Sequence, residues 1–228
     1  MLREKHLGLS ASVIDGIGHV MEQADWVIVL EDDLLVQPAF LSYLNAALDR
    51  YRSQTVVFSV CGYGNRVVTP AGFLADTYFG PRSSSWGWAT WRDRWTSVDW
   101  NPSPEVMRCH ARAFNAWGGS DCAHMLRQWM AGKNDSWAIR FGFSQFLQDK
   151  VSLFPVRSLV DPSPGFDGSG THCRKYNRFR FLLDDRDPSR TFLFPETPVV
   201  DPHIRKSILR YHSLPARAWS RLMYLLHV

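Results

Sequence analysis

The pattern of apolar and polar positions at the start of the chain predicts a helix, a strand, a second helix and a second strand. Apolar side chains recur at helical spacing over residues 10–24, and an unbroken apolar run follows at residues 26–30. Pro38 suits the first turn of the second helix, and residues 55–60 resemble a second strand. This β-α-β succession predicts an α/β fold with a mostly parallel, Rossmann-like sheet flanked by helices.

The rest of the chain is predicted to complete this domain over residues 1–173 and to add a basic, helical C-terminal extension over residues 174–228 that packs on it. The further elements expected from the pattern are strands at 77–80 and 151–154, helices at 105–117, 122–130 and 141–147, a glycine- and proline-rich loop at 159–173, and short helices at 204–211 and 216–226.

Composition narrows the class of protein. Of the 228 residues, 45% are hydrophobic, which is enough to build a core, so we exclude a disordered or fibrous chain. No apolar stretch reaches the roughly 18 residues of a membrane span. The four cysteines lack CxxC spacing, which favours reduced thiols and a cytoplasmic protein.

Positive charge is concentrated at the C-terminal end. Residues 174–228 hold 11 Lys/Arg against 5 Asp/Glu, an excess of +6, within a chain of net charge +4. No basic run exceeds two residues, so we expect a solvated surface and no nucleic-acid binding. The last predicted helix carries an apolar stripe beside Arg217 and Arg221, which either docks on its own domain or makes peripheral contact with the inner face of a membrane.

Three adjacent carboxylates, the acidic triplet Glu31, Asp32 and Asp33, directly follow the first predicted strand. Open α/β sheets bind their ligands beyond the carboxyl ends of the strands. Adjacent acids repel one another, and a hard divalent cation that carries diphosphate oxygens would relieve this repulsion. The triplet therefore predicts a metal and diphosphate site, with a solvated acidic turn as the alternative.

A tryptophan-rich segment contains Trp86, Gly87 and Trp88. Large aromatic side chains at partly helical spacing are typical of a core. Gly87 between two tryptophans indicates a close approach of the backbone to another group. The alternative to a core is an aromatic wall on which a sugar ring stacks.

Two further segments carry candidate chemistry. Asp135 opens a predicted helix and is either an N-cap or the base that takes a proton from an acceptor hydroxyl; Asp121 competes for that role. In the glycine-rich loop, Gly168, Ser169 and His172 could form a lid that cradles phosphate, with a flexible linker as the alternative.

Taken in order, the acidic triplet, the segment 86–91, the segment 135–137 and the loop 165–172 resemble bacterial sugar-nucleotide glycosyltransferases of a polysaccharide-biosynthesis branch, distantly similar to N-acetylglucosaminyltransferase I. The resemblance covers about residues 3–173. It implies a GT-A fold, a Mn²⁺ or Mg²⁺ ion, a nucleotide-diphosphate sugar donor, a saccharide acceptor and inversion at the anomeric carbon.

The resemblance also implies a role for single residues. Asp33 would hold the metal, and Glu31 and Asp32 would contact the donor together with Trp86, Gly87, Trp88, Gly168, Ser169 and His172. Asp135 would be the base, although the related motif has two adjacent acids where this chain has one.

Relatives of this kind carry their nucleoside-binding strands before the segment that corresponds to the start of this chain. We therefore expect an N-terminally truncated GT-A-like domain whose first strand has an open edge, where a protein partner or a second copy could pair. Two other functions stay open: a non-catalytic remnant that binds a partner, and a Mg²⁺-dependent phosphohydrolase.

Overall fold

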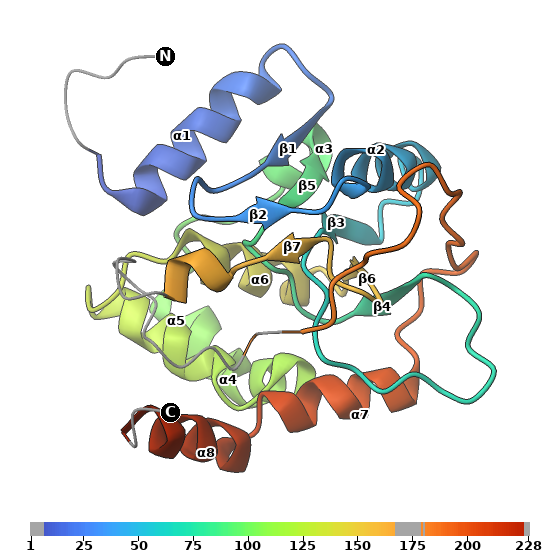
Figure 1. Cartoon of the computed structure of the whole chain (residues 1–228). Helices are drawn as coiled ribbons and strands as arrows, with labels where there is room; N and C mark the ends of the chain where they lie inside the picture. Colours follow the sequence, from blue (N-terminus) through green and yellow to red (C-terminus); the bar gives the residue numbers. More distant parts are fainter. Residues whose placement is uncertain (1–6, 167–178, 180, 226–228) are drawn as a thin grey trace.

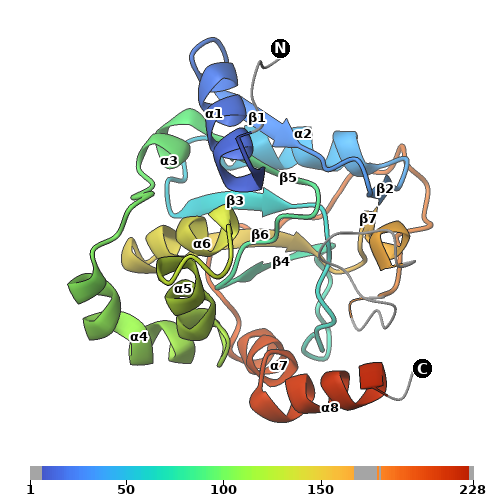
Figure 2. The same ribbon diagram turned by 90° about the vertical axis from the view of Figure 1, so that its left-hand side faces the viewer.

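The computed structural model describes residues 7–166, 179 and 181–225, and in this part of the chain a five-stranded sheet lies between helices (Figures 1 and 2). Its strands, in spatial order, are β1 (Trp26–Val29), β5 (Trp88–Trp91), β3 (Val57–Cys61), β6 (Val151–Pro155) and β4 (Thr77–Gly80).

The sheet is mixed, and this corrects the predicted mostly parallel arrangement. Only β3 and β6 pair in parallel, whereas the β1–β5, β3–β5 and β4–β6 pairs are antiparallel. β1 and β3 do run in the same direction, as a β-α-β unit requires, but β5 lies between them. The tryptophan-rich segment supplies this strand, because aromatic and β-branched side chains at Trp88–Trp91 suit a pleated, buried surface.

Side chains from alternate positions of the strands enter two different cores. On one face, Ala89 and Trp91 of β5 pack with helix α2 (Phe40–Arg50). On the other face, Trp88 packs with helix α1 (Leu9–Met21) and helix α6 (Trp137–Leu147). The result is a three-layer α/β/α arrangement (Figure 2).

Helices α3 (Arg92–Thr96), α4 (Pro104–Gly118) and α5 (Cys122–Met130) extend the layer that contains α6. Buried side chains of α4, α5 and α6 form a separate apolar cluster. At the other end of the sheet, α7 (Pro202–Tyr211) packs on β4 and β6 through Ile204 and Ile208, and α8 (Leu214–Leu225) follows it at the periphery (Figure 1).

A small two-stranded sheet lies beside the main one and holds the chain directly after the acidic triplet. β2 (Leu35–Val36) pairs antiparallel with β7 (Val160–Asp161), which precedes the 3₁₀ turn η1 (Ser163–Phe166). The triplet is thus held between β1 and β2. Within the described residues, β1 is an edge strand that pairs with β5 alone.

No helix in the described ranges has both the length and the apolar character needed to cross a bilayer. Cys61, Cys109 and Cys122 are free thiols.

Candidate functional site

The acidic triplet and the Trp86–Gly87 segment lie at the same end of one strand pair. β1 and β5 are antiparallel, with Val29 opposite Trp88. The residues that follow β1 and those that precede β5 therefore come at the same end of this pair. This register puts Glu31 and Trp86, which are far apart in the sequence, at one end of the β1–β5 pair.

Within the triplet, Glu31 is half-buried, whereas Asp32 and Asp33 are exposed. Burial, together with the smaller influence of the neighbouring charges of Asp33 and Asp32, raises the pKa of Glu31 from 4.5 to about 7. Ionisation of all three carboxylates is therefore unfavourable at this site, and a bound cation would reduce the repulsion among them.

The triplet does not form a complete metal cage. Across the ranges that the structure describes, no group of three or more His, Cys, Asp or Glu side chains is arranged to hold a metal ion. A divalent ion bound at Asp33 would need further oxygen ligands from a substrate and from water. Mg²⁺ sites with substrate phosphates have this character, since they use one or two carboxylates and keep several waters.

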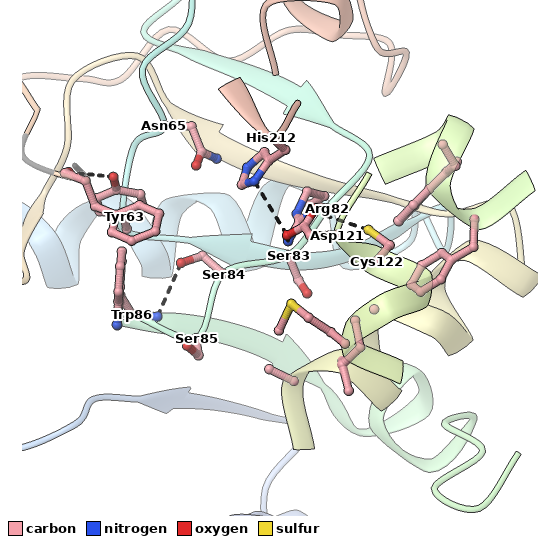
Figure 3. A pocket seen from close by; sticks show the side chains of 17 residues that line it. Tyr63, Asn65, Arg82, Ser83, Ser84, Ser85, Trp86, Asp121, Cys122 and His212 are labelled. Atoms are coloured by element: carbon pink, nitrogen blue, oxygen red, sulfur yellow. Dashed lines mark hydrogen bonds and ion pairs between the residues drawn. The ribbon is translucent and has the colours of Figure 1, made fainter. Parts of the chain in front are cut away.

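The segment that leads into β5 lines a cavity of about 280 Å³ (Figure 3). Trp86 and Tyr63 form an aromatic part of its wall, and Arg82, Asp121 and His212 form a polar part. Three consecutive serines and one amide add hydroxyl and amide groups to the lining: Asn65, Ser83, Ser84 and Ser85. Such a mixture of ring faces and hydrogen-bonding groups is typical of a site for a polar small molecule.

A bidentate ion pair organises the polar wall. Arg82 Nη1 lies 2.8 Å from Asp121 Oδ1, and Nη2 lies 3.1 Å from Oδ2. Arg82 also donates to the Gly118 carbonyl oxygen at 3.0 Å. Burial raises the pKa of Asp121, but the charge and hydrogen bonds of Arg82, helped by His212, outweigh burial and lower it below its usual value. Asp121 is therefore a firmly ionised anchor and a poor proton acceptor.

His212 joins this pair from the C-terminal end of α7. Its Nδ1 lies 3.8 Å from Asp121 Oδ2. Ser120 donates to its backbone carbonyl oxygen at 2.9 Å. The predicted C-terminal extension thus contributes a side chain to the wall of the cavity.

Nearby Cys122 accepts a hydrogen bond from Arg82 at 3.3 Å. Burial nevertheless raises the pKa of its thiol to about 11, against the opposing influence of Arg82. Cys122 is therefore a neutral thiol near pH 7 and not an activated nucleophile.

The three residues predicted as an aromatic sugar site have different environments. Trp86 lines the cavity and packs edge-on against Tyr63, with ring centroids 4.9 Å apart. Trp88 is fully buried and stacks on Trp137 at 4.9 Å, so the alternative of a core residue holds for Trp88. Its indole is not accessible to a sugar.

Gly87 also serves the fold itself. It has φ +59°, and a Cβ added there would lie 2.8 Å from Val160 Cγ2 and 2.9 Å from Phe40 Cε2. The Gly87 carbonyl accepts a hydrogen bond from the Gly62 amide at 2.7 Å. The close approach expected at this glycine is therefore made by the protein's own core.

Asp135 lies at the start of α6, three residues before the cavity-lining Ala138. It is exposed and accepts a hydrogen bond at 3.1 Å from the Ser10 amide in the first turn of α1. Ser136, not Asp135, is the N-cap of α6, because its hydroxyl accepts from the Ile139 amide at 3.3 Å. Asp135 thus caps a different helix while one carboxylate oxygen stays available.

Gly168, Ser169 and His172, predicted as a phosphate-binding lid, lie outside the described residues.

Sequence reasoning did not find Arg82 or His212 as parts of the cavity. An arginine that follows a strand and a histidine between two helices belong to no recognisable sequence motif. Only the tertiary fold brings these two residues to Asp121. Comparison with known proteins adds no assignment: no family model matches the chain, and no curated protein matches it.

Proposed function

We propose that this protein is a metal-dependent inverting glycosyltransferase with a GT-A-like fold. It would move a sugar from a nucleotide-diphosphate donor to a hydroxyl of a saccharide acceptor, in the cytoplasm and in the synthesis of a surface polysaccharide. The observation that carries the proposal is the register of β1 and β5, by which the acidic triplet that follows β1 and the cavity-lining Trp86 that precedes β5 come at the same end of one strand pair. The resemblance of four ordered motifs supports the same activity.

The acidic triplet fits a divalent ion in its chemistry. Three adjacent carboxylates, one with a pKa raised to about 7, gain stability when a cation reduces their repulsion. Asp33 would hold Mn²⁺ or Mg²⁺, and Glu31 and Asp32 would face the donor. When bound, the ion supplies positive charge to the departing diphosphate.

The cavity would hold the saccharide. Sugar rings present C–H groups to aromatic faces and hydroxyls to polar side chains, and Trp86 offers the first kind of contact. Arg82, Asp121 and His212 offer the second kind. Because Arg82 and Asp121 hold each other at fixed positions, their remaining hydrogen-bonding capacity is pre-oriented.

Asp135 would take the proton from the acceptor hydroxyl. It is exposed at the end of α6 that carries the cavity-lining Ala138 and Ile139. Asp121 fits this role less well, because its lowered pKa and its bidentate pairing weaken it as a base.

The test is a turnover assay on the full chain with a panel of nucleotide sugars, with and without Mn²⁺, in the presence of mono- and disaccharide acceptors. We expect metal-dependent release of nucleoside diphosphate and its loss in Asp135→Asn. Release of inorganic phosphate without an acceptor would favour the phosphohydrolase. Turnover unaffected by removal of divalent ions would overturn the proposal.

A further inference from the structure

Helix α8 leaves its apolar face uncovered. Leu214 is 66% exposed, Trp219 60%, Leu222 46% and Leu225 63%. These are large side chains, and each would gain free energy on leaving water. By contrast, α7 directly before it buries Ile204 and Ile208 against the sheet. Of these two helices, α8 is therefore the one that exposes large apolar side chains.

The exposed side chains form one continuous surface. At about 100° per residue, Leu214, Leu222 and Leu225 fall within roughly 80° of arc, and Trp219 lies about 60° further round. Ala216 and Met223, which are partly buried, lie on the other side of the helix. The helix thus rests on the protein with one side and presents a leucine- and tryptophan-rich side outward. We call the set Leu214, Trp219, Leu222 and Leu225 the α8 apolar face.

The charged side chains of α7 and α8 all have the same sign. From residue 202 to the end, the sequence contains no Asp or Glu and five Lys/Arg: Arg205, Lys206, Arg210, Arg217 and Arg221. Arg221 flanks the apolar face directly, and Arg205, Lys206 and Arg210 are exposed on α7. Both views show α7 and α8 along one side of the molecule (Figures 1 and 2).

An apolar face with only cations among the charged residues of its own helix and of the helix before it fits a surface that is apolar inside and anionic outside. A bilayer with anionic lipids has this structure, and interfacial helices that bind it carry Trp and Leu on one side and Arg on the other. A water-soluble protein partner would need both an apolar patch and an acidic rim of matching shape. The bilayer needs no such match.

We propose that α8 lies in the surface of an anionic bilayer, with its apolar face among the acyl chains and the α7–α8 arginines at the lipid phosphates. The contact is peripheral, because α8 has 12 residues and does not span. The inference concerns attachment and does not depend on the reaction that the protein catalyses.

The test is flotation of the purified full chain with vesicles of phosphatidylcholine alone and of phosphatidylcholine mixed with phosphatidylglycerol. We expect binding to the anionic vesicles only, weakened by added salt. The variant Trp219→Ser/Leu222→Ser/Leu225→Ser should lose binding by at least about tenfold. Arg217→Gln/Arg221→Gln should weaken it by about fivefold for each arginine near the surface.

The matched control is Val20→Ser/Leu41→Ser, which removes two exposed apolar side chains from α1 and α2, on the side of the molecule opposite α8 (Figures 1 and 2); Val20 is 42% and Leu41 58% exposed. It should bind like the unchanged protein. Thermal unfolding of each variant checks that the fold persists.

Three results would overturn the proposal. One is equal binding to neutral and anionic vesicles, or binding to neither. Another is undiminished binding by the triple serine variant. The third is a dimer in light scattering that the triple variant converts to a monomer without any vesicle binding, which would assign the α8 apolar face to a second copy.

Discussion

Replacing Glu31 by glutamine should stabilise the protein at high pH and leave its stability unchanged at low pH. The substitution keeps the shape of the side chain and removes its charge. In the folded protein, burial and the charges of Asp33 and Asp32 raise the pKa of Glu31 from 4.5 to about 7. Because the folded-state pKa lies above the unfolded value, ionisation of Glu31 costs stability as pH rises through this interval.

The magnitude follows from the size of the shift. A change from 4.5 to about 7 corresponds to at most about 3.5 kcal/mol at roughly 1.4 kcal/mol per unit. Glu31 is only half-buried, so solvent screening reduces this figure to about 1–2 kcal/mol. The gain should be complete at about pH 8 and absent at about pH 4, below the unfolded pKa.

The assay is urea unfolding followed by far-ultraviolet circular dichroism at both pH values. Glu196→Gln, at an exposed glutamate elsewhere, is the matched control and should show less than about 0.5 kcal/mol of change. An equal gain for Glu31→Gln at both pH values, or no gain at high pH, would refute the electrostatic reasoning about the triplet.

Three further substitutions test the packing around the site. Arg82→Met should lower the free energy of unfolding by about 3 kcal/mol, because it leaves a buried carboxylate unpaired; Arg157→Met, in an exposed pair, should cost less than about 1 kcal/mol in the same chemical denaturation. Gly87→Ala should destabilise by about 2–4 kcal/mol in thermal unfolding, through strain and overlap. Gly72→Ala has positive φ but open space around it, so a cost as large would contradict the overlap. Trp88→Ala should cost about 3–5 kcal/mol as a core cavity, and a cost below about 1 kcal/mol would refute its place in the core.

Periodicity predicted most elements of the fold. The amphipathic pattern at residues 10–24 became α1, the pattern at 122–130 became α5, and strand β4 has the predicted bounds. The two helices were predictable because each buries one face, so that its apolar residues recur at helical spacing in the sequence. β4 differs, since it is buried along its whole length. The order of the elements along the chain also gave the α/β class.

The local pattern of apolar and polar residues could not predict the order of the strands in the sheet. β5 lies between β1 and β3, and there Trp88 packs in the core on one face of the sheet while Trp91 packs in the core on the other face. Both cores are built from helices distant in sequence. The partly helical spacing of the tryptophans was interpreted as core or as a ligand wall, and the strand that Trp88–Trp91 forms was not predicted.

The candidate site was likewise predictable in part. The triplet was found because three adjacent acids after an apolar run are unusual and costly. Arg82 and His212 were not predicted as site residues. Their role depends on the 2.8 Å ion pair between Arg82 and Asp121 and on the 3.8 Å distance between the His212 imidazole and Asp121, which join three separate parts of the chain. Gly87 was singled out correctly for a close approach, but the neighbour is Phe40 and Val160 rather than a ligand.

The central claim is that Asp33 holds a divalent ion that carries a nucleotide sugar. The most direct measurement is calorimetric titration of the full chain with a panel of nucleotide sugars, with Mn²⁺ and after its removal. We predict binding that requires Mn²⁺ and that Asp33→Asn weakens by at least about tenfold, while the exposed-site control Asp49→Asn binds normally. Metal-dependent binding that survives Asp33→Asn unchanged would contradict the account.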